Sequence, residues 1–232
     1  MIKTYLTADE IRGMIDAADN LRDKLIISFY ADTGARASEL LQLRVRDIDL
    51  KNNIALIPHL KRGVKKACPG CGRTAGRNTR FCSKCGRDLS KVQATGIEER
   101  TRLINISPQT KSLLQEYVEP LSPDDLIIGL TRQQVYNIVR GLAARIGIDG
   151  KSILNPETGK LHFVHPHNFR DSLAVEWLNF AADDISKQKA LQEHLGHKSF
   201  NTTMRYHKLA PDTVQKISNE VWQARFNKEK ES

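Results

Sequence analysis

The chain has 232 residues, of which 40% are hydrophobic and 27% charged, and this balance is typical of a globular protein with enough length for a sizeable core. No apolar run approaches the roughly 20 residues that would cross a bilayer, and residues 1–6 lack the apolar stretch of a signal peptide. These features argue against a membrane-spanning protein and against an exported one. We expect a cytoplasmic location without membrane contact.

The first predicted elements are helices with recognisable ends. A capping box at residues 7–10, Thr-Ala-Asp-Glu, predicts a helix that runs to about Ala18. The apolar residues 25–30 predict a buried helix that ends at Gly34. A short helix is expected from Ser38 onward, with its leucines turned inward.

Two strands are predicted next, at residues 53–60 and 101–106, and they pair as a β-hairpin. Residues 64–92, which lie between them, are interpreted as an insertion that turns the hairpin end into a small zinc-ribbon-like module. A unit of this size cannot fold on its own apolar burial, so we expect a metal ion to stabilise it.

All four cysteines of the chain lie in this insertion, as two Cys-x2-Cys pairs with ten residues between them. Four thiolates at this spacing are typical of a tetrahedral structural Zn²⁺ site. Two disulfides are the alternative, which a reducing cytoplasm disfavours. The predicted zinc ligands are Cys68, Cys71, Cys82 and Cys85.

The net charge of +9 is concentrated in the same part of the chain. Residues 61–91 hold five lysines and five arginines against a single aspartate, which accounts for the whole excess. A focused basic segment predicts contact with nucleic acid, and a solvated basic loop is the alternative. We hypothesise that the module clamps DNA, rather than serving as a structural knob, through Arg73, Arg77, Arg80, Lys84 and Arg87.

The remaining predicted elements are helical. Helices are expected from Pro108, over residues 131–146, from Pro166 to about residue 180, and over residues 185–195, where Gly196 ends the last of these. A short helix over residues 199–207 and a final helix from Pro211, with apolar Val214, Ile217, Val221 and Trp222, complete the pattern. The expected fold is mostly α with one small antiparallel β-sheet, an α+β arrangement.

Five residues from three separate segments have the chemistry to cut a phosphodiester without a metal ion. Tyrosine is a nucleophile whose phenolate also leaves readily, arginines donate paired hydrogen bonds to phosphate, and histidines move protons. Each residue alone has a simpler interpretation, such as an Arg36–Glu39 ion pair or a half-buried core tyrosine. In the functional interpretation, Glu39 instead holds the Arg36 guanidinium in place for the phosphate. The five residues are Arg36, His167, Arg170, His197 and Tyr206.

Together, in this order, the three segments resemble those of the tyrosine recombinase (phage-integrase) family. The resemblance covers residues 4–208 apart from the insertion, and it includes the nine-residue interval from His197 to Tyr206. It implies that Tyr206 forms a 3′-phosphotyrosyl link, that Arg36 and Arg170 hold the phosphate, and that His167 and His197 bond the phosphate or move the tyrosine proton. The family needs no catalytic metal.

The resemblance also implies a general-acid lysine near the hairpin turn, for which Lys61 is the first choice, with Lys65 and Lys66 as alternatives. Many relatives have a second histidine where this chain has Asp171. Double-stranded DNA and a homotetramer on that DNA are the implied partners. Whether Tyr206 acts in its own subunit or in a neighbour stays open.

The implied organisation is a single catalytic domain over residues 1–232, interrupted by the insertion. The N-terminal DNA-embracing domain of the family is not expected in this chain, which is interpreted as either a trimmed protein or a minimal recombinase for DNA integration in a mobile element. Two other functions remain open. One is a non-catalytic zinc-ribbon DNA-binding regulator, and the other is a type IB topoisomerase, which shares the chemistry but relaxes supercoils.

Overall fold

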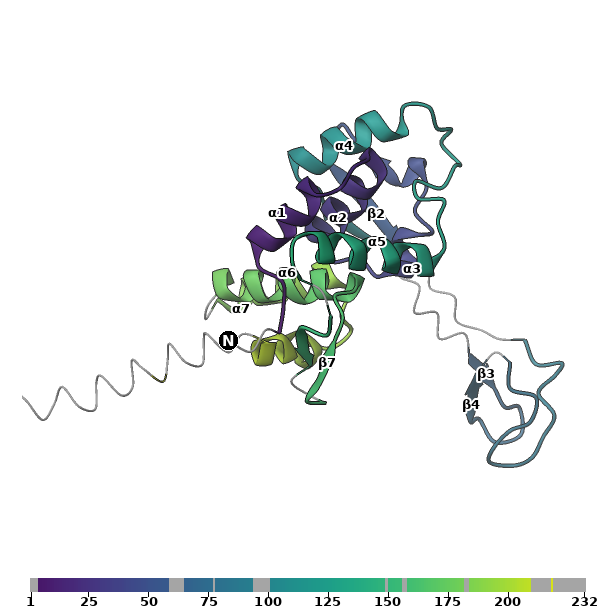
Figure 1. Ribbon diagram of the computed structural model, residues 1–232. Helices are drawn as coiled ribbons and strands as arrows, with labels where there is room; N and C mark the ends of the chain where they lie inside the picture. Colours follow the sequence, from purple (N-terminus) through teal and green to yellow (C-terminus); the bar gives the residue numbers. More distant parts are fainter. Residues whose placement is uncertain are drawn as a thin grey trace, which may run out of the picture. The chain divides into compact units, whose positions relative to one another are not determined.

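The computed structural model describes residues 4–58, 65–76, 78–93, 101–148, 150–155, 158–181, 184–209 and 218. Contacts divide the chain into two compact units, of which the first comprises Met1–Ile57 and Arg102–Ser232 and the second Pro58–Thr101 (Figure 1). The first unit is mostly helical and carries a three-stranded sheet, while the second contains a two-stranded sheet of its own. The predicted class, mostly α with small antiparallel sheets, is confirmed.

The N-terminal helices begin and end where local chemistry predicts. The Thr7 side chain accepts from the Glu10 backbone N–H while the Glu10 carboxylate accepts from that of Thr7, which completes the capping box. Gly34 ends the second helix in the left-handed conformation, at φ +55°. These helices are α1 (Ala8–Asp16), α2 (Leu21–Thr33) and α3 (Ala37–Leu40).

The main sheet has the strand order β1-β2-β5. β2 (Ile54–Pro58) and β5 (Thr101–Asn105) match the predicted hairpin strands within the described residues. A short edge strand, β1 (Ile48–Asp49), pairs antiparallel with β2 after the 3₁₀ turn η1 (Val45–Asp47) and was absent from the sequence prediction. Two residues carry too little alternation to be recognised as a strand in advance.

The C-terminal half supplies the remaining helices. Pro108 occupies the first turn of its helix after the Ser107 cap, and Gly196 ends another in the left-handed conformation. An unpredicted hairpin of β6 (Ile153–Asn155) and β7 (Lys160–His162) precedes the helix that starts at Pro166. The helix predicted from Pro211 lies outside the described residues except for residue 218. The helical elements are α4 (Pro108–Val118), α5 (Arg132–Arg145), α6 (Pro166–Ala181), α7 (Ile185–Leu195), α8 (Phe200–Met204) and the 3₁₀ turn η2 (Arg205–Leu209).

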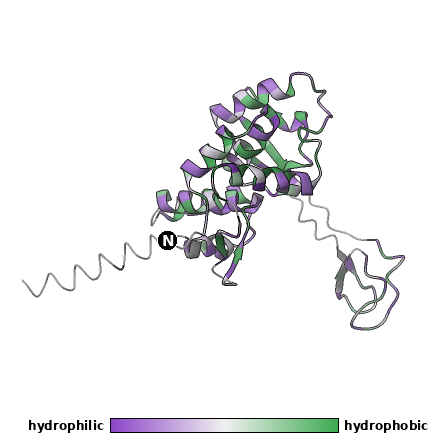
Figure 2. Cartoon of the chain, in the orientation of Figure 1, coloured by the Kyte–Doolittle hydropathy of each residue, from purple (hydrophilic) through white to green (hydrophobic). Residues whose placement is uncertain are grey.

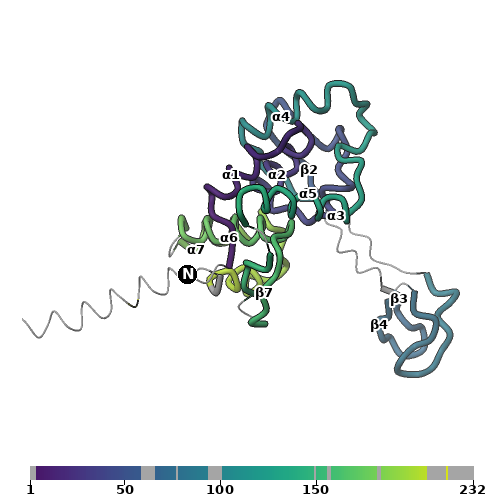
Figure 3. Tube along the Cα trace, viewed as in Figure 1, coloured from purple at the N-terminus to yellow at the C-terminus, as the bar shows by residue number. Residues whose placement is uncertain are grey.

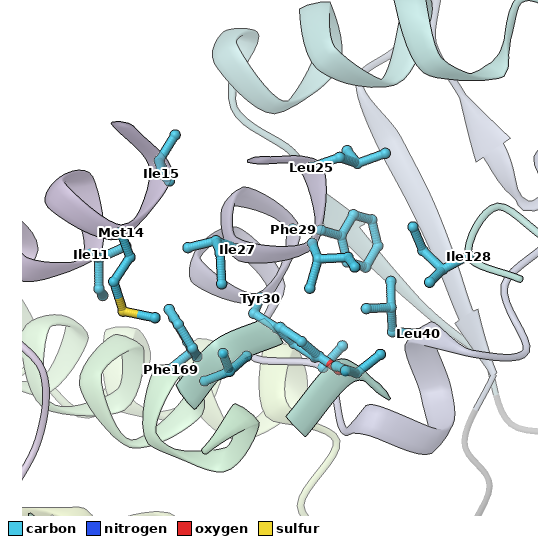
Figure 4. Packing of buried hydrophobic residues seen from close by; sticks show 14 of the residues in the cluster. Ile11, Met14, Ile15, Leu25, Ile27, Phe29, Tyr30, Leu40, Ile128 and Phe169 are labelled. Atoms are coloured by element: carbon cyan, nitrogen blue, oxygen red, sulfur yellow. The ribbon is translucent and has the colours of Figure 1, made fainter. Parts of the chain in front are cut away.

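The core of the first unit forms around α2, which contacts α1, α4 and α6. Its residues 25–30 are all buried, so this helix lacks a polar face over that stretch, whereas the surrounding helices show green and purple sides in Figure 2. In Figure 4, Met14 of α1 points toward Phe169 of α6, and both lie beside Ile27 of α2. None of the described helices is both long and apolar enough to cross a bilayer.

A second apolar cluster lies between α6 and α7. Its buried members include Leu178, Leu191 and Leu195, and Tyr206 of η2 packs against them. In Figure 3 the segment of α8 and η2 runs beside α6, in agreement with the contacts between α6 and η2. The element that carries Tyr206 is therefore fixed to the helix that carries His167 and Arg170.

The second unit is the cysteine-containing insertion. Its hairpin consists of β3 (Lys65–Ala67) and β4 (Thr74–Gly76), paired antiparallel. Two tight turns, one between β3 and β4 and one after β4, share a hydrogen-bond pattern, because the N–H groups of Gly72 and Gly86 donate to the carbonyls of Cys68 and Cys82. Among the residues of this unit that the structure describes, Cys68, Cys82 and Leu89 are buried, and a core of this size is too small to stabilise the unit alone.

Gly34 tests how tightly the core is organised around the end of α2. Its φ of +55° is strained for other residues, and an added Cβ would come within 3.1 Å of Leu173 Cδ2 and 3.2 Å of Leu195 Cδ2. We expect Gly34→Ala to lower the free energy of unfolding by about 1–3 kcal/mol in denaturant titration. Gly141→Ala is the matched control in α5, where no atom lies within 4 Å of the added Cβ. It should raise stability by about 0.5–1 kcal/mol; equal effects of the two changes would contradict this account.

Candidate functional site

Arg170 is the residue that joins the three separate sequence segments. It lies on α6 with a relative exposure of 1%. Its Nη1 donates to the carbonyl of Gly34 at 2.8 Å, and its Nη2 donates to the carbonyl of Leu195 and to His197 Nε2 at 2.9 Å. One buried guanidinium therefore holds the end of α2, the end of α7 and the loop that contains His197.

These contacts determine the protonation of His197. A guanidinium only donates hydrogen bonds, so Nε2 must be the accepting nitrogen. The proton then lies on Nδ1, which donates to Thr203 Oγ1 at 2.8 Å. Burial, reinforced by the charges of Arg170 and Arg36, lowers the pKa of His197 to about 3. His197 is therefore neutral at physiological pH, with both of its ring nitrogens engaged in hydrogen bonds.

Tyr206 packs directly against His197. The two rings are stacked with centroids 5.8 Å apart and planes 16° apart. Tyr206 has a relative exposure of 9%, and burial raises the pKa of its phenol. The positive charge of Arg170 and a hydrogen bond with it act in the opposite direction. The phenol is thus protonated at neutral pH, beside groups that favour its anion.

Arg36 enters the same site from the start of α3. Its Nη1 donates to Glu39 Oε1 at 2.7 Å and its backbone N–H donates to Glu39 Oε2 at 2.9 Å. The Glu39 side chain is fully buried while 23% of the Arg36 side chain is exposed. The Arg36 charge reaches His167, His197 and Tyr206, since it lowers the pKa of each.

His167 lies in the first turn of α6, with Nε2 3.7 Å from Asp171 Oδ1. Burial and the Arg170 charge lower the pKa of His167 to about 4, although half of its side chain reaches solvent. Burial raises the pKa of Asp171 to about 7, and this carboxyl in turn raises the pKa of Tyr206. Asp171 therefore belongs to the site. It occupies the position where many members of the resembling family have a second histidine.

Arg102 was missed by the sequence interpretation. It lies on β5 with a relative exposure of 8% and donates to both oxygens of Glu39, at 3.3 and 2.8 Å. A signal was available, because Arg102 shares its strand phase with buried Ile104 whereas Leu103 is 67% exposed. A charged residue in the inward phase of a strand indicates a buried partner.

The three lysines considered for the general acid differ in how much of them the structure describes. Lys61 lies outside the described residues, as does the side chain of Lys65. Lys66 donates through Nζ to the carbonyl of Leu89 at 2.9 Å, so its ammonium is engaged within the insertion.

Most of the proposed DNA-binding residues are exposed on the insertion. Arg73, Arg80, Lys84 and Arg87 are exposed, and Arg77 lies outside the described residues. Arg87 has a second role, since its Cζ lies 2.9 Å from the point that a Cβ on Gly70 would occupy. Its guanidinium therefore covers the first cysteine turn.

The four cysteines converge on one point. Cys68 Sγ lies 3.5 Å from Cys85 Sγ, Cys71 Sγ lies 3.5 Å from Cys82 Sγ, and all four sulfurs lie within 4.8 Å of one another. Zn–S bonds of about 2.3 Å in a tetrahedron require S···S separations of about 3.8 Å, so the donor set fits Zn²⁺. All four cysteines are free thiols rather than disulfides. Backbone N–H groups of Lys84 and Cys85 lower the pKa of Cys82 to about 6, which favours the thiolate that a metal needs.

The family model described as the phage integrase family matches residues 4–212. The chain belongs to this family. The matched range includes Arg36, His167, Arg170, His197 and Tyr206, which the structure brings together from the three segments.

Similar proteins agree with this membership. The chain is 27% identical over 206 residues to tyrosine recombinase XerA of Saccharolobus solfataricus, with 89% of this chain and 52% of the relative covered. It is 29% identical over 218 residues to tyrosine recombinase XerD of Bifidobacterium longum, with 90% and 59% covered. The chain therefore spans between half and three fifths of the length of these two relatives.

Solved structures show the same fold. The crystal structure of XerA recombinase superimposes with a TM-score of 0.62 at 20% identity, covering 95% of this chain and 65% of that one. The catalytic domain of bacteriophage HP1 integrase has a TM-score of 0.53 at 17% identity, with 94% of both chains covered. The arrangement of helices around the site is thus that of phage integrase catalytic domains.

His194 provides a test of the electrostatics around the site. Burial, followed by the charge of Arg102, lowers its pKa to about 4, and its ring lies 4.9 Å from that of Trp177. The unfolded chain, with an ordinary histidine pKa, takes up this proton first as the pH falls, so stability should decrease between about pH 6.5 and pH 4. Between pH 7 and 5 this one group should contribute a loss of about 1–2 kcal/mol.

We expect His194→Gln, which keeps a hydrogen-bond donor but does not titrate, to lose less thermal stability than the parent protein between pH 7 and pH 5. Asp171 acts in the opposite direction, because a raised carboxyl pKa contributes stability that is lost as the pH rises. Asp171 is present in both proteins, so the difference between them isolates His194. Parallel pH profiles would show that His194 is not held neutral by the fold.

Proposed function

We propose that this chain is the catalytic domain of a site-specific DNA recombinase that cuts and rejoins DNA through Tyr206. The observation that carries the proposal is the stacking of Tyr206 on a neutral His197 that is itself bonded to Arg170. A nucleophile, a neutral imidazole and a buried cation are therefore in direct succession, which places positive charge beside the attacking oxygen.

In the proposed reaction the phenol oxygen of Tyr206 attacks the phosphorus and the bond to the 5′-oxygen breaks. The product is a 3′-phosphotyrosyl link and a free 5′-hydroxyl, and the reverse attack by a 5′-hydroxyl rejoins the strand. The phenolic proton passes to a neutral imidazole, for which His167 is the proposed acceptor, because the accepting nitrogen of His197 is already bonded to Arg170. The leaving 5′-oxygen receives a proton from a general acid, and Lys61 remains the proposed donor.

The phosphate would be held by the arginines. Arg36 is the more solvent-accessible of the two arginines predicted to clamp it, at 23% of its side chain, and so presents donors toward an incoming strand. Arg170 supplies positive charge from the buried side of the site, where its own hydrogen bonds hold Gly34 and His197 in place. His167, half exposed at the start of α6, would complete the set, and a helix N-terminus favours an anion there.

Known relatives support double-stranded DNA as the partner. The solved structure of XerH recombinase in a post-cleavage complex with its palindromic difH substrate superimposes with a TM-score of 0.62 at 20% identity, covering 96% of this chain and 54% of that one. We carry the DNA partner over to this chain on the strength of the shared family and fold. Assembly as a homotetramer on DNA follows from the family and is proposed on the same basis.

Covalent capture tests the reaction. The chain is incubated with a nicked suicide duplex from the DNA flanking its own gene, and a denaturation-resistant adduct is measured by gel. We expect the adduct to form without a divalent metal and to disappear in Tyr206→Phe, which removes only the nucleophilic oxygen. Tyr136→Phe serves as the matched control and should keep the adduct.

Each outcome separates the competing functions. No adduct with any duplex would exclude an enzyme and favour a non-catalytic DNA-binding regulator. An adduct accompanied by supercoil relaxation without strand exchange would favour a type IB topoisomerase. An adduct that persists in Tyr206→Phe would refute the assignment of the nucleophile.

We further propose that the insertion is a zinc module that clamps DNA. The four converging sulfurs support a structural Zn²⁺, and the exposed Arg73, Arg80 and Lys84 give the module a positive surface. The exposed ring of Phe81, with the Arg80 guanidinium 5.2 Å from its centroid, adds an aromatic group to this surface. Such a surface suits the DNA backbone, where cations displace bound counterions.

The clamp predicts a change in affinity without loss of the metal. We expect the triple change of Arg73, Arg80 and Lys84 to Glu to keep one zinc per chain by elemental analysis. DNA affinity should fall more than tenfold, and the slope of log affinity against log salt should flatten by about 3. The matched control reverses Lys24, Lys51 and Lys111 in the first unit. Equal losses of DNA affinity in both variants would indicate an effect of net charge alone and contradict the clamp. An unchanged salt slope in the triple variant would also refute it.

A further inference from the structure

The Glu39 carboxylate is shared by two arginines. Oε1 accepts from Arg36 Nη1 at 2.7 Å and from Arg102 Nη1 at 3.3 Å. Oε2 accepts from the Arg36 backbone N–H at 2.9 Å and from Arg102 Nη2 at 2.8 Å. A carboxylate has about four acceptor positions, so these four donors saturate it.

The two arginines differ in what they can reach. Arg102 is 8% exposed and its Nε has no hydrogen-bond partner among the described residues, while Glu39 is fully buried. Arg36 has 23% of its side chain exposed and extends its charge over His167, His197 and Tyr206. Arg102 is therefore the buried support, and Arg36 is the arginine that an incoming phosphate would meet.

The net charge of these three side chains determines how strongly they attract a phosphate. Arg36 and Glu39 alone would form a neutral pair, and the carboxylate would then offset much of the attraction of Arg36 for a phosphate. Arg102 restores one net positive charge to the group of three. Its field extends into the site, because the Arg102 charge contributes to lowering the pKa values of Arg170, His194 and His197.

The geometry adds a second effect. With two-point contact from Arg102, the Glu39 carboxylate cannot rotate without breaking charge-assisted hydrogen bonds in a buried place. A fixed carboxylate fixes the guanidinium of Arg36 on its other side. Catalysis by preorganised charge depends on this kind of rigidity.

We propose that Arg102 is a positioning residue that acts through Glu39: it orients the Arg36 guanidinium toward the scissile phosphate and keeps the group of three cationic. The proposal deepens the recombinase function and rests on it for its catalytic consequence. Its structural part, the restraint on Arg36, does not depend on that function.

Two variants and one control test it. Arg102→Met keeps an unbranched side chain but removes the charge and both donors. Arg102→Lys keeps the charge with a one-point contact in place of two. Leu103→Met, on the exposed face of the same strand, is the control for a change in β5.

The first measurement needs no activity. The ¹⁵N–¹H relaxation of the Arg36 Nε–H group reports its order, which should fall in Arg102→Met, fall less in Arg102→Lys and stay unchanged in Leu103→Met. An Arg36 signal equally ordered in all the folded proteins would overturn the proposal. If Arg102→Met does not fold, Arg102→Lys alone decides the outcome on the same criterion.

The second measurement compares adduct formation on a normal duplex and on one with a neutral methylphosphonate at the scissile position. We expect Arg102→Met to slow the reaction about 10- to 100-fold on the phosphate at saturating DNA, and less than about threefold on the methylphosphonate, where no anion needs to be neutralised. Equal losses on the two substrates would indicate a structural role only and refute the proposal. Absence of an adduct with the parent protein would refute the recombinase function instead, and the relaxation measurement would then decide the role of Arg102.

Discussion

The guanidinium of Arg170 is the contact on which the arrangement of the site depends. It is almost completely buried, so water cannot accept its hydrogen bonds and the protein must supply the acceptors. They are met by the carbonyls at the ends of α2 and α7 and by His197. Both helices end at a left-handed glycine, Gly34 and Gly196, which exposes those carbonyl groups. Local chain reversal and a buried charge thus determine together how three distant segments meet.

Three arginines give the site its positive charge, and the free-energy cost of burying them is offset in two ways. Arg36 and Arg102 share the buried Glu39, whereas Arg170 relies on backbone carbonyls and a neutral ring. Each histidine near these cations has a lowered pKa, so the imidazoles stay neutral and can accept protons. The site therefore combines net positive charge with neutral imidazoles. The proposed phosphodiester substrate would provide both an anion and a reaction that uses a neutral imidazole.

Much of the fold could be predicted because its signals are local. The Thr7 capping box, Pro108 and the glycines at positions 34 and 196 mark helix ends through backbone chemistry that acts within a few residues. The five proposed site residues could be grouped in advance because three segments resemble a known family, and their catalytic roles stay a prediction. The β6–β7 hairpin and the two-residue β1 could not, because short strands carry little periodicity. Arg102 was missed because its role comes from a tertiary contact with Glu39, 63 positions away, and from a strand phase that apolar Leu103 obscures.

The direct test of this account is to identify the amino acid that becomes joined to DNA. The adduct formed on a suicide duplex is digested with nuclease and protease, and the nucleotide-bearing peptide is sequenced by mass spectrometry. We predict a single modified peptide with the nucleotide on Tyr206, the ring that lies against His197 and Arg170. A nucleotide on any other residue, whether another tyrosine or a serine of the same loop, would contradict the account.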